Sequence, residues 1–263
     1  MDLASRCAAV IPCLNEAATI EALVHEVRRC LAAVIVVDDG STDGTAERAR
    51  RVGAEVIQHE RPRGKGAALT AGWGRAREHS YSWALSLDGD GQHAPSDIQA
   101  FLRCAERTGA SLVVGNRMDD SSGMPWLRRG VNRWMSRRIS RLTGRWLPDT
   151  QCGFRLMHLD AWAQIRLNAD HFEIESELLW QFIAAGQSVE FVPVRVIYRD
   201  EQSKIQPLRD ARRWFRWWWQ ARGGHETRLL DMPAGGRTND ELRSTKEFQN
   251  PNDPRMPKSR APL

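Results

Sequence analysis

The sequence of 263 residues contains no apolar run long enough to cross a lipid bilayer. Its N-terminus offers only a short apolar stretch between Asp2 and Asn15, which is not the pattern of a secretory signal peptide. The five cysteines are an odd number and none of them is spaced C-x-x-C, which argues against a disulfide framework and against a zinc site. These absences predict a protein of the reducing cytoplasm.

Two common nucleotide-binding motifs are also missing. The segment 12–16, which follows the first apolar run, lacks the glycines that let the pyrophosphate of a dinucleotide approach a helix N-terminus. The stretch Gly64-Lys65-Gly66 has neither the spacing nor the following Ser or Thr of a Walker loop. Dinucleotide and P-loop sites are therefore not expected. Lys65 is still a candidate contact for a phosphate, and the alternative is a solvated side chain in a glycine-rich turn.

Composition sets the scale of the protein. With 41% hydrophobic residues the chain can bury one good-sized core, so we expect one main domain. The net charge of +5 is mild, and only its distribution can be informative. Eleven tryptophans against two tyrosines are unusual, and several of the tryptophans stand beside arginines.

Short apolar segments alternate with helical patterns along the chain. This alternation predicts an α/β fold, with a mostly parallel, twisted sheet and helices on both faces. The expected extended segments are 8–11, 34–37, 55–58, 84–87, 111–114, 152–157 and 189–198. The expected helices are 16–31 with Asn15 as N-cap, one that ends near residue 51, 67–78, 96–107, 125–145, 173–185 and 208–222.

The stretch 88–92, with the sequence DGDGQ, follows one of these apolar runs. A buried strand there delivers Asp88 and Asp90 to its C-terminal edge, which is where open α/β sheets bind ligands. Two carboxylates one residue apart repel each other unless a cation lies between them, and oxygen ligands suit Mg²⁺ or Mn²⁺ on the phosphates of a substrate. The stretch therefore predicts a metal–diphosphate site. The alternative is a loop whose Asp residues cap the helix that Pro95 begins.

Several motifs together resemble glycosyltransferase family 2. They stand in the order and at the spacing of that family: Pro12-x-x-Asn15-Glu16, Val37-Asp38-Asp39-Gly40-Ser41-x-Asp43-Gly44-Thr45, Gly64-Lys65-Gly66 and Asp88-Gly89-Asp90-Gly91-Gln92-His93. Later motifs resemble its branch of dolichyl- or polyprenyl-phosphate sugar synthases: Gly115-Asn116-Arg117, Asp149-x-Gln151-Cys152-Gly153-Phe154-Arg155 and Ser203-Lys204. The resemblance extends over residues 8–205 and implies a GT-A fold.

The resemblance also implies a donor site for a nucleotide-diphospho-sugar. Asp88, Asp90 and Gln92 match the family's ligands for Mg²⁺ or Mn²⁺ on the diphosphate. Leu14 stands where the family often has an aromatic residue, which weakens any expectation of stacking on the base. The residues expected around the nucleotide are Pro12, Leu14, Asn15, Glu16, Asp38, Asp39 and Lys65.

The acceptor decides whether a general base is needed. A phosphate oxygen is already anionic at neutral pH, whereas a hydroxyl must lose a proton during attack. For a phosphate acceptor, the motifs offer a clamp made of Arg117, Arg155, Ser203 and Lys204. The alternative for Arg155 is an ion pair with Asp149 or a neighbouring carboxylate. For a sugar hydroxyl, the sequence leaves three candidate bases open: Asp149, Glu175 and Glu177.

The segment 208–222 predicts a basic amphipathic helix, with tryptophans on one side and arginines on the other. Such a helix suits the lipid interface, and the arginine-rich segment 128–145 repeats the theme. The alternative is an ordinary helix that packs its aromatic side on the domain. We expect residues 1–205 to form the catalytic domain, 206–222 the interfacial helix and 223–263 a disordered tail.

These features predict a metal-dependent, inverting hexosyltransferase of the cytoplasm, attached peripherally to the inner face of the membrane. It would move a sugar from a UDP- or GDP-linked donor to polyprenyl phosphate. One alternative is transfer to a saccharide or glycolipid hydroxyl, and another is a non-catalytic protein whose basic side binds anionic lipid or partners. No nucleic-acid motif accompanies the basic segments, so a nucleic-acid partner is not expected. The sequence leaves the oligomeric state open.

Overall fold

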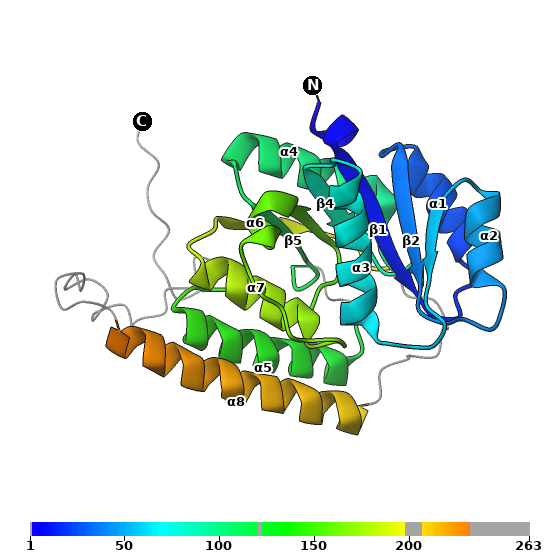
Figure 1. The fold of residues 1–263 in the computed structure, drawn as a ribbon. Helices are drawn as coiled ribbons and strands as arrows, with labels where there is room; N and C mark the ends of the chain where they lie inside the picture. The colour runs from blue at the N-terminus through cyan, green and yellow to red at the C-terminus, as the bar shows by residue number, and fades with distance from the viewer. Residues whose placement is uncertain (1, 120–122, 198–206, 232–263) are drawn as a thin grey trace.

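The computed structural model of the protein describes residues 2–119, 123–197 and 207–231. Its centre is a seven-stranded sheet with the strand order β3-β2-β1-β4-β6-β5-β7 (Figure 1). Strand β6 runs antiparallel to β4 and β5, and the other neighbouring pairs are parallel. The expected mostly parallel sheet is confirmed. The strands are β1 (Cys7–Cys13), β2 (Ala33–Asp38), β3 (Glu55–Gln58), β4 (Trp83–Ser86), β5 (Leu112–Asn116), β6 (Arg155–His158) and β7 (Val189–Pro193).

Helices cover both faces of this sheet (Figure 1). Strands β1 and β2 are therefore buried on both sides, which explains why they are nearly continuous runs of small and branched apolar residues. The α-helices are α1 (Ile20–Arg28), α2 (Thr45–Arg51), α3 (Lys65–Glu78), α4 (Ile98–Thr108), α5 (Trp126–Thr143), α6 (Leu159–Ala163), α7 (Ile174–Ala184) and α8 (Pro207–Asp231). Two short 3-10 helices are η1 (Leu3–Arg6) and η2 (Pro95–Asp97).

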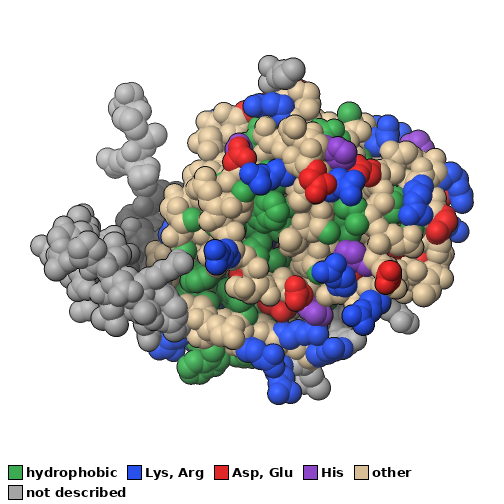
Figure 2. Space-filling model, in the orientation of Figure 1, with side chains coloured by type: hydrophobic (Ala, Val, Ile, Leu, Met, Phe, Trp, Pro, Cys, Tyr) green, Lys and Arg blue, Asp and Glu red, His purple; other side chains and the backbone are tan. Residues whose placement is uncertain are grey.

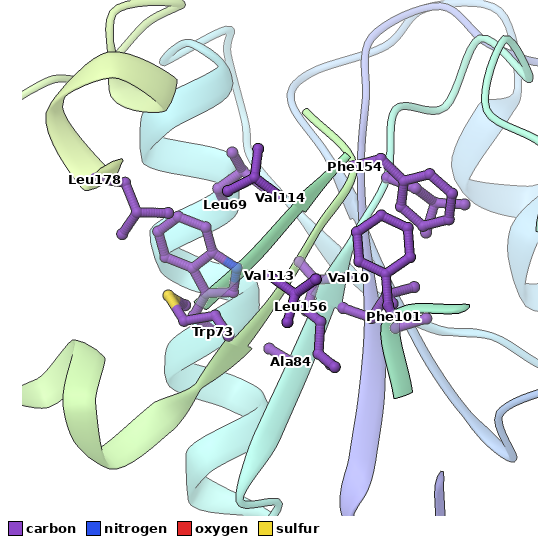
Figure 3. Close-up of a cluster of buried hydrophobic side chains, with 14 of the residues drawn as sticks. Val10, Leu69, Trp73, Ala84, Phe101, Val113, Val114, Phe154, Leu156 and Leu178 are labelled. Carbon is purple, nitrogen blue, oxygen red and sulfur yellow. The ribbon is translucent and has the colours of Figure 1, made fainter. Parts of the chain in front are cut away.

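The core is built from large side chains packed around the central strands (Figure 3). The rings of Phe101 and Phe154 lie with their centroids 4.4 Å apart. Trp73 of α3 is buried, and its Nε1 donates a hydrogen bond to Ser86 Oγ at 2.9 Å. The indole therefore buries its apolar body without leaving a polar atom unpaired. This contact fixes α3 against β4, the strand that leads to Asp88.

Gly72 marks a close approach of α3 to the sheet. A Cβ added there would overlap Val10 Cγ1 and lie 3.1 Å from Val37 Cγ2. We therefore expect Gly72→Ala to lower the free energy of unfolding by about 1–3 kcal/mol in urea denaturation. Gly74→Ala in the same helix is the matched control. A Cβ at Gly74 meets nothing within 4 Å, so helix propensity should raise stability by up to about 1 kcal/mol, and equal effects at both positions would contradict tight packing at Gly72.

Three helices, α5, α7 and α8, lie side by side next to the sheet (Figure 1). Trp214 and Trp217 of α8 are buried in this layer. The Trp214 ring lies 5.4 Å from Trp134 of α5, and the Trp217 ring lies 6.5 Å from Trp180 of α7. Trp214 Nε1 also donates to Ser176 Oγ at 2.9 Å. Trp214 and Trp217 therefore pack on the domain, which is the alternative that the sequence analysis gave for the aromatic side of this helix.

Helix α8 continues past the expected end at Arg222 as far as Asp231. A glycine inside a helix is less favourable than alanine by about 1 kcal/mol, but Gly223 and Gly224 do not end this helix. The expected disordered tail was 223–263, and its first part, 223–231, is helical instead. The rest of that tail, from residue 232 onward, lies outside the described residues. Within the ranges that the structure describes, no helix combines the length and the apolar character that a membrane span requires.

Helix α1 starts later than the sequence indicates. It begins at Ile20, after Thr19, so the expectation that Asn15 caps it is wrong. Asn15 has a left-handed backbone with φ of 53° and binds the loop after β2 instead. Its N–H donates to Ser41 Oγ at 2.8 Å, and its Oδ1 accepts from the Thr42 N–H at 2.9 Å. Capping rules consider local partners only, and Ser41 lies 26 residues further along the chain.

Candidate active site

The carboxyl ends of β1, β2 and β4 meet at one edge of the sheet. Strands β1 and β2 are in register up to Cys13 and Asp38, and β4 pairs with β1 from Trp83 to Ser86. The polar residues that follow these strands therefore lie together, at the edge where such sheets bind ligands. Gly89 permits this close approach, because a Cβ there would lie 2.6 Å from Cys13 Sγ.

Asp88 lies at the centre of this edge, with 29% of its side chain exposed. Its Oδ1 lies 2.6 Å from Lys65 Nζ, and its Oδ2 lies 3.4 Å from His93 Nε2. Burial by itself would raise the pKa of Asp88. The charge of Lys65 and the contact with His93 outweigh burial and hold that pKa well below its usual range. Asp88 is therefore an anion at neutral pH.

Asp90 and Gln92 follow on the same loop. Asp90 Oδ1 accepts a hydrogen bond from the Gln92 N–H at 2.9 Å. Burial and the charge of Asp88 raise the pKa of Asp90, so the two carboxylates are close enough to disfavour each other's charge. A cation between them would relieve this repulsion, and the oxygen atoms of these three side chains suit Mg²⁺ or Mn²⁺. Among the described residues no group of three His, Cys, Asp or Glu could hold a metal, so further ligands would come from a bound donor or from water.

Lys65 is the cation that the protein itself places at this edge. Its Nζ lies 2.6 Å from Asp88 Oδ1 and 2.6 Å from Glu175 Oε1 of α7. Burial disfavours the ammonium form, but the two carboxylates outweigh it and raise the pKa of Lys65 above its usual value. At the first turn of α3, the Gly66 N–H donates to Asp170 O at 2.8 Å. The start of this helix is therefore bonded within the protein, and contact of Lys65 with a phosphate stays a prediction.

Asp39 organises the turn that leads to Lys65. Its Oδ1 lies 2.7 Å from His59 Nδ1 and accepts from the Arg63 N–H at 2.9 Å. Its Oδ2 accepts from the Gly64 N–H at 2.7 Å. Both oxygens of this carboxylate thus have partners inside the protein, which indicates that Asp39 shapes the loop.

Asp38 has a different environment, although it is the neighbouring residue. It is fully buried, and its Oδ1 accepts from the Ser41 N–H at 2.9 Å. Its Oδ2 is buried and has no hydrogen-bond partner among the residues that the structure describes. Leaving a buried carboxylate oxygen unsatisfied is costly, so this atom is a candidate acceptor for a donor group on a bound molecule.

The end of β1, with Pro12, and the loop after it, with Leu14, Asn15 and Glu16, border the carboxylate loop. A Cβ on Gly89 would lie 3.2 Å from Pro12 O and 3.3 Å from Glu16 Cγ. The Glu16 N–H donates to Thr45 Oγ1 at 2.8 Å, which ties the loop to the start of α2. The residues expected around a nucleotide and those expected around a metal are thus brought to the same edge.

Arg117 and Asp149 form a buried ion pair, with side chains exposed by 7% and 0%. The Arg117 Nε donates to Asp149 Oδ2 at 2.8 Å, and its Nη2 donates to Oδ1 at 2.9 Å. Burial would lower the pKa of Arg117, but the paired carboxylate raises it above its usual value. The guanidinium charge is therefore balanced inside the protein.

Arg155 is enclosed by backbone carbonyl groups. Its Nε donates to Cys152 O at 2.7 Å, its Nη1 to Glu175 O at 2.6 Å and its Nη2 to Thr150 O at 3.0 Å. It thereby joins β6 to the start of α7, and the ion pair with Asp149 that the sequence offered as an alternative is made by Arg117 instead. Direct contact of these two arginines with an acceptor phosphate gains no support from this geometry. Ser203 and Lys204, the other members of the predicted clamp, lie outside the described residues.

Two further residues complete the site in ways that sequence reasoning missed. Glu175 was expected only as a candidate base, and it is the second partner of Lys65. It stands 110 residues away from Lys65, so no local spacing indicates the pair. Gly153 leaves room for the ion pair, because a Cβ there would lie 2.9 Å from both Lys65 Nζ and Asp88 Oδ1. Its place in a family-like motif is the signal that could have drawn attention to it.

Comparison with known proteins bears out the resemblance. A family model described as glycosyl transferase family 2 matches residues 8–166, more than half of the chain. A polyprenol monophosphomannose synthase of Mycolicibacterium smegmatis is 28% identical over 205 residues, which cover 73% of this chain and 77% of that protein. A UDP-N-acetylglucosamine–dolichyl-phosphate N-acetylglucosaminyltransferase of Methanococcus voltae is 28% identical over 214 residues, which cover 73% of this chain and 85% of that protein.

A solved structure with a similar fold is glucosyl-3-phosphoglycerate synthase from Mycobacterium tuberculosis in complex with Mn²⁺, uridine diphosphate and phosphoglyceric acid. It matches with a TM-score of 0.63 at 22% identity and covers 88% of this chain and 80% of its own. At this identity the likeness shows the fold alone, which is of GT-A type.

Proposed function

Because the chain belongs to glycosyltransferase family 2, we propose that it transfers a sugar from a nucleotide-diphospho-sugar to polyprenyl phosphate, with inversion at the anomeric carbon. The observation that carries the proposal is the mutually repelling carboxylate pair Asp88 and Asp90 at the ligand edge of the sheet. The acceptor is suggested by relatives that are named for polyprenol and dolichyl phosphate. Residues 1–205 are proposed to form the catalytic domain.

The donor is proposed to bind along the ends of β1, β2 and β4. Asp88, Asp90 and Gln92 would hold Mg²⁺ or Mn²⁺ on its diphosphate. A divalent cation there supplies charge neutralisation for the departing nucleoside diphosphate. The buried Asp38 Oδ2, which has no hydrogen-bond partner among the described residues, is proposed to accept a hydrogen bond from the base. The segment from Pro12 to Glu16, which spans the end of β1 and the loop after it, would border the nucleotide.

A phosphate acceptor fits this site better than a hydroxyl, because each candidate base already has a partner. Asp149 is paired with Arg117, and Glu175 is paired with Lys65. Glu177 Oε2 accepts hydrogen bonds from the N–H groups of Asn168 and Ala169, at 3.0 and 2.8 Å.

A phosphate oxygen needs no base, since it is already anionic. It would attack the anomeric carbon, a new C–O bond would form, and the bond from that carbon to the diphosphate oxygen would break with its electrons on the leaving group. Arg117, Arg155, Ser203 and Lys204 stay proposed contacts of the acceptor. For the two arginines the contact would require a change of partners.

We propose that the outer side of α5 and α8 rests on the lipid surface at the inner face of the membrane. Trp126 of α5 and Trp219 of α8 are exposed by 77% and 63%, and the rings of Trp134 and Phe215 join the two helices at 5.5 Å. Lys and Arg side chains gather along the same edge, at the bottom of the view (Figure 2). Exposed tryptophan beside arginine is typical of helices that lie in the lipid interface. This aromatic–arginine face consists of Trp126, Leu127, Val131, Arg133, Trp134, Arg137, Phe215 and Trp219.

The arginines of this face provide a test. Each basic side chain near an anionic membrane contributes about 1 kcal/mol, so the double variant Arg133→Gln/Arg137→Gln should weaken binding to vesicles containing phosphatidylglycerol roughly thirtyfold. Co-sedimentation with the vesicles measures the affinity. The matched control is Arg103→Gln/Arg107→Gln, which removes two exposed arginines at the same spacing from α4. Equal loss in both variants would refute attachment through α5.

The function itself is tested with a panel of UDP- and GDP-linked sugars and Mn²⁺, with and without polyprenyl phosphate. Relatives are named for mannose, galacturonate and N-acetylglucosamine, and the solved structure is named for glucose, so the panel should include donors of these four sugars. Mass spectrometry should detect a glycosyl polyprenyl phosphate from one donor. Product on a saccharide hydroxyl alone would overturn the proposed acceptor. Absence of both donor binding and turnover would favour a non-catalytic protein that binds anionic lipid.

A further inference from the structure

We propose that Lys65 is a resident counter-ion of the donor site, which competes with the divalent cation for Asp88 and withdraws onto Glu175 when the cation binds. The inference rests on the proposed donor site at Asp88 and Asp90. It adds a residue whose charge sets how tightly that site takes its cation before any donor arrives. The ammonium of Lys65 acts through Asp88, so Lys65 is a positioning residue in this account.

The Lys65 ammonium has two carboxylate partners, Asp88 and Glu175. Lys65 Nζ lies 2.6 Å from Asp88 Oδ1 on one side and 2.6 Å from Glu175 Oε1 on the other. The Lys65 side chain is only 13% exposed, and its Nζ lies 5.7 Å from the centre of the Phe172 ring. The ammonium is therefore largely shielded from water, and its charge is balanced by these two carboxylates.

A metal ion at this site would need the Asp88 carboxylate that Lys65 contacts. Lys65 holds Oδ1 of Asp88, and His93 lies beside Oδ2 at 3.4 Å. A divalent ion that ligates this carboxylate meets an ammonium on the same group, and in a half-buried site the repulsion between them is strong. Binding of the ion therefore favours departure of the ammonium from Asp88.

The ion pair with Glu175 lets the Lys65 ammonium leave Asp88 and still have a carboxylate beside it. Glu175 is 7% exposed on its side chain, so its own anion needs a partner whether or not a metal is bound. Gly153 has no side chain at the point where the ammonium and Asp88 meet, and a Cβ there would lie 2.9 Å from the ammonium nitrogen. With the ion on Asp88 and Asp90, and Lys65 on Glu175, each of these three carboxylates has a cation beside it.

The test is the affinity of the full-length protein for Mn²⁺ without nucleotide, measured by electron paramagnetic resonance of the free ion. Lys65→Met removes the competitor, and we expect Mn²⁺ to bind about tenfold more tightly. Glu175→Gln removes the second carboxylate partner of Lys65 and leaves the ammonium on Asp88, so Mn²⁺ should bind several-fold more weakly. In the double variant most of the effect of Glu175→Gln should disappear, because that residue acts through Lys65. Arg63→Met is the matched control, since it removes an exposed positive charge from the same loop and should change the affinity little.

The outcomes separate this inference from the proposed function. Weaker or unchanged Mn²⁺ binding by Lys65→Met, and by the double variant with Glu175→Gln, in proteins that circular dichroism shows to be folded, overturns the competition. Asp88→Asn should abolish binding in every background, and if it does so while Lys65→Met fails to tighten binding, the donor site stands and the role of Lys65 falls. Absence of Mn²⁺ binding to the wild-type protein, with and without nucleotide, overturns both.

Discussion

Asp88→Asn should reduce sugar transfer by about 100- to 1000-fold in kcat, because it removes a fixed negative charge that the donor site needs for its cation. The side chain keeps its size and its place at the end of β4, so the loss is one of charge and not of packing. The measurement is steady-state transfer with the donor that the panel identifies, at saturating donor and at a Mn²⁺ concentration that saturates the wild-type protein.

The control for this variant is Asp160→Asn. Asp160 is a carboxylate of α6 with 71% of its side chain exposed, and its loss should leave transfer within twofold of the wild type, which is about 0.4 kcal/mol. Thermal unfolding of both variants verifies that they are folded. Transfer by Asp88→Asn at the rate of the control would remove Asp88 from the metal site.

Asp149→Asn should lower the free energy of unfolding by about 3–5 kcal/mol, because it leaves the buried Arg117 guanidinium without a counter-charge. In a domain of this size that loss lowers Tm by roughly 6–20 °C. Burial would raise the pKa of Asp149, but the charge of Arg117 outweighs it and keeps that pKa below its usual value. The carboxylate is therefore ionised in the wild type at neutral pH, where urea denaturation should be measured.

An exposed ion pair supplies the comparison. Arg51 lies 3.0 Å from Glu21 with 69% of its side chain in solvent, and breaking such a pair costs at most about 1 kcal/mol. Arg51→Met should therefore have a small effect. A similarly small effect of Asp149→Asn would mean that the Arg117 charge is reached by water and free to bind a ligand, which would restore its predicted role at the acceptor phosphate.

The strands β1, β2, β4 and β5 could be predicted because each contains a short apolar run that is followed by turn residues. Strand β3 has only two apolar residues, Val56 and Ile57, and was indicated by its place between two helical patterns. The position and direction of β6 could not be predicted. The mostly apolar segment 152–157 indicates a buried strand, but the pattern of apolar residues does not specify strand order or direction. The insertion of β6 antiparallel between β4 and β5 follows from tertiary pairing alone.

The carboxylate edge of the site was predictable for a local reason. Asp38 is the last residue of β2 and Asp88 comes two residues after β4, and parallel strands deliver their ends to one edge. The partners of the arginines were not predictable, because Asp149 reaches Arg117 across 32 residues. A motif indicates which residues matter and leaves open which of them hold the fold together.

The aromatic side of α8 shows a similar division. A helical wheel identifies Trp214, Trp217 and Trp219 as one side, but it contains no information on what covers that side. Trp214 and Trp217 pack into the layer with α5 and α7, whereas Trp219 is exposed. Only the exposed part is available for the lipid contact proposed above.

The most direct test of the central claim is a crystal structure with Mn²⁺ and the nucleoside diphosphate of the active donor, recorded at the manganese absorption edge. The anomalous peak should lie between the carboxylates of Asp88 and Asp90 and the diphosphate, with Lys65 bonded to Glu175. A peak elsewhere, or a diphosphate bound at this edge with no manganese between it and Asp88, would contradict the account.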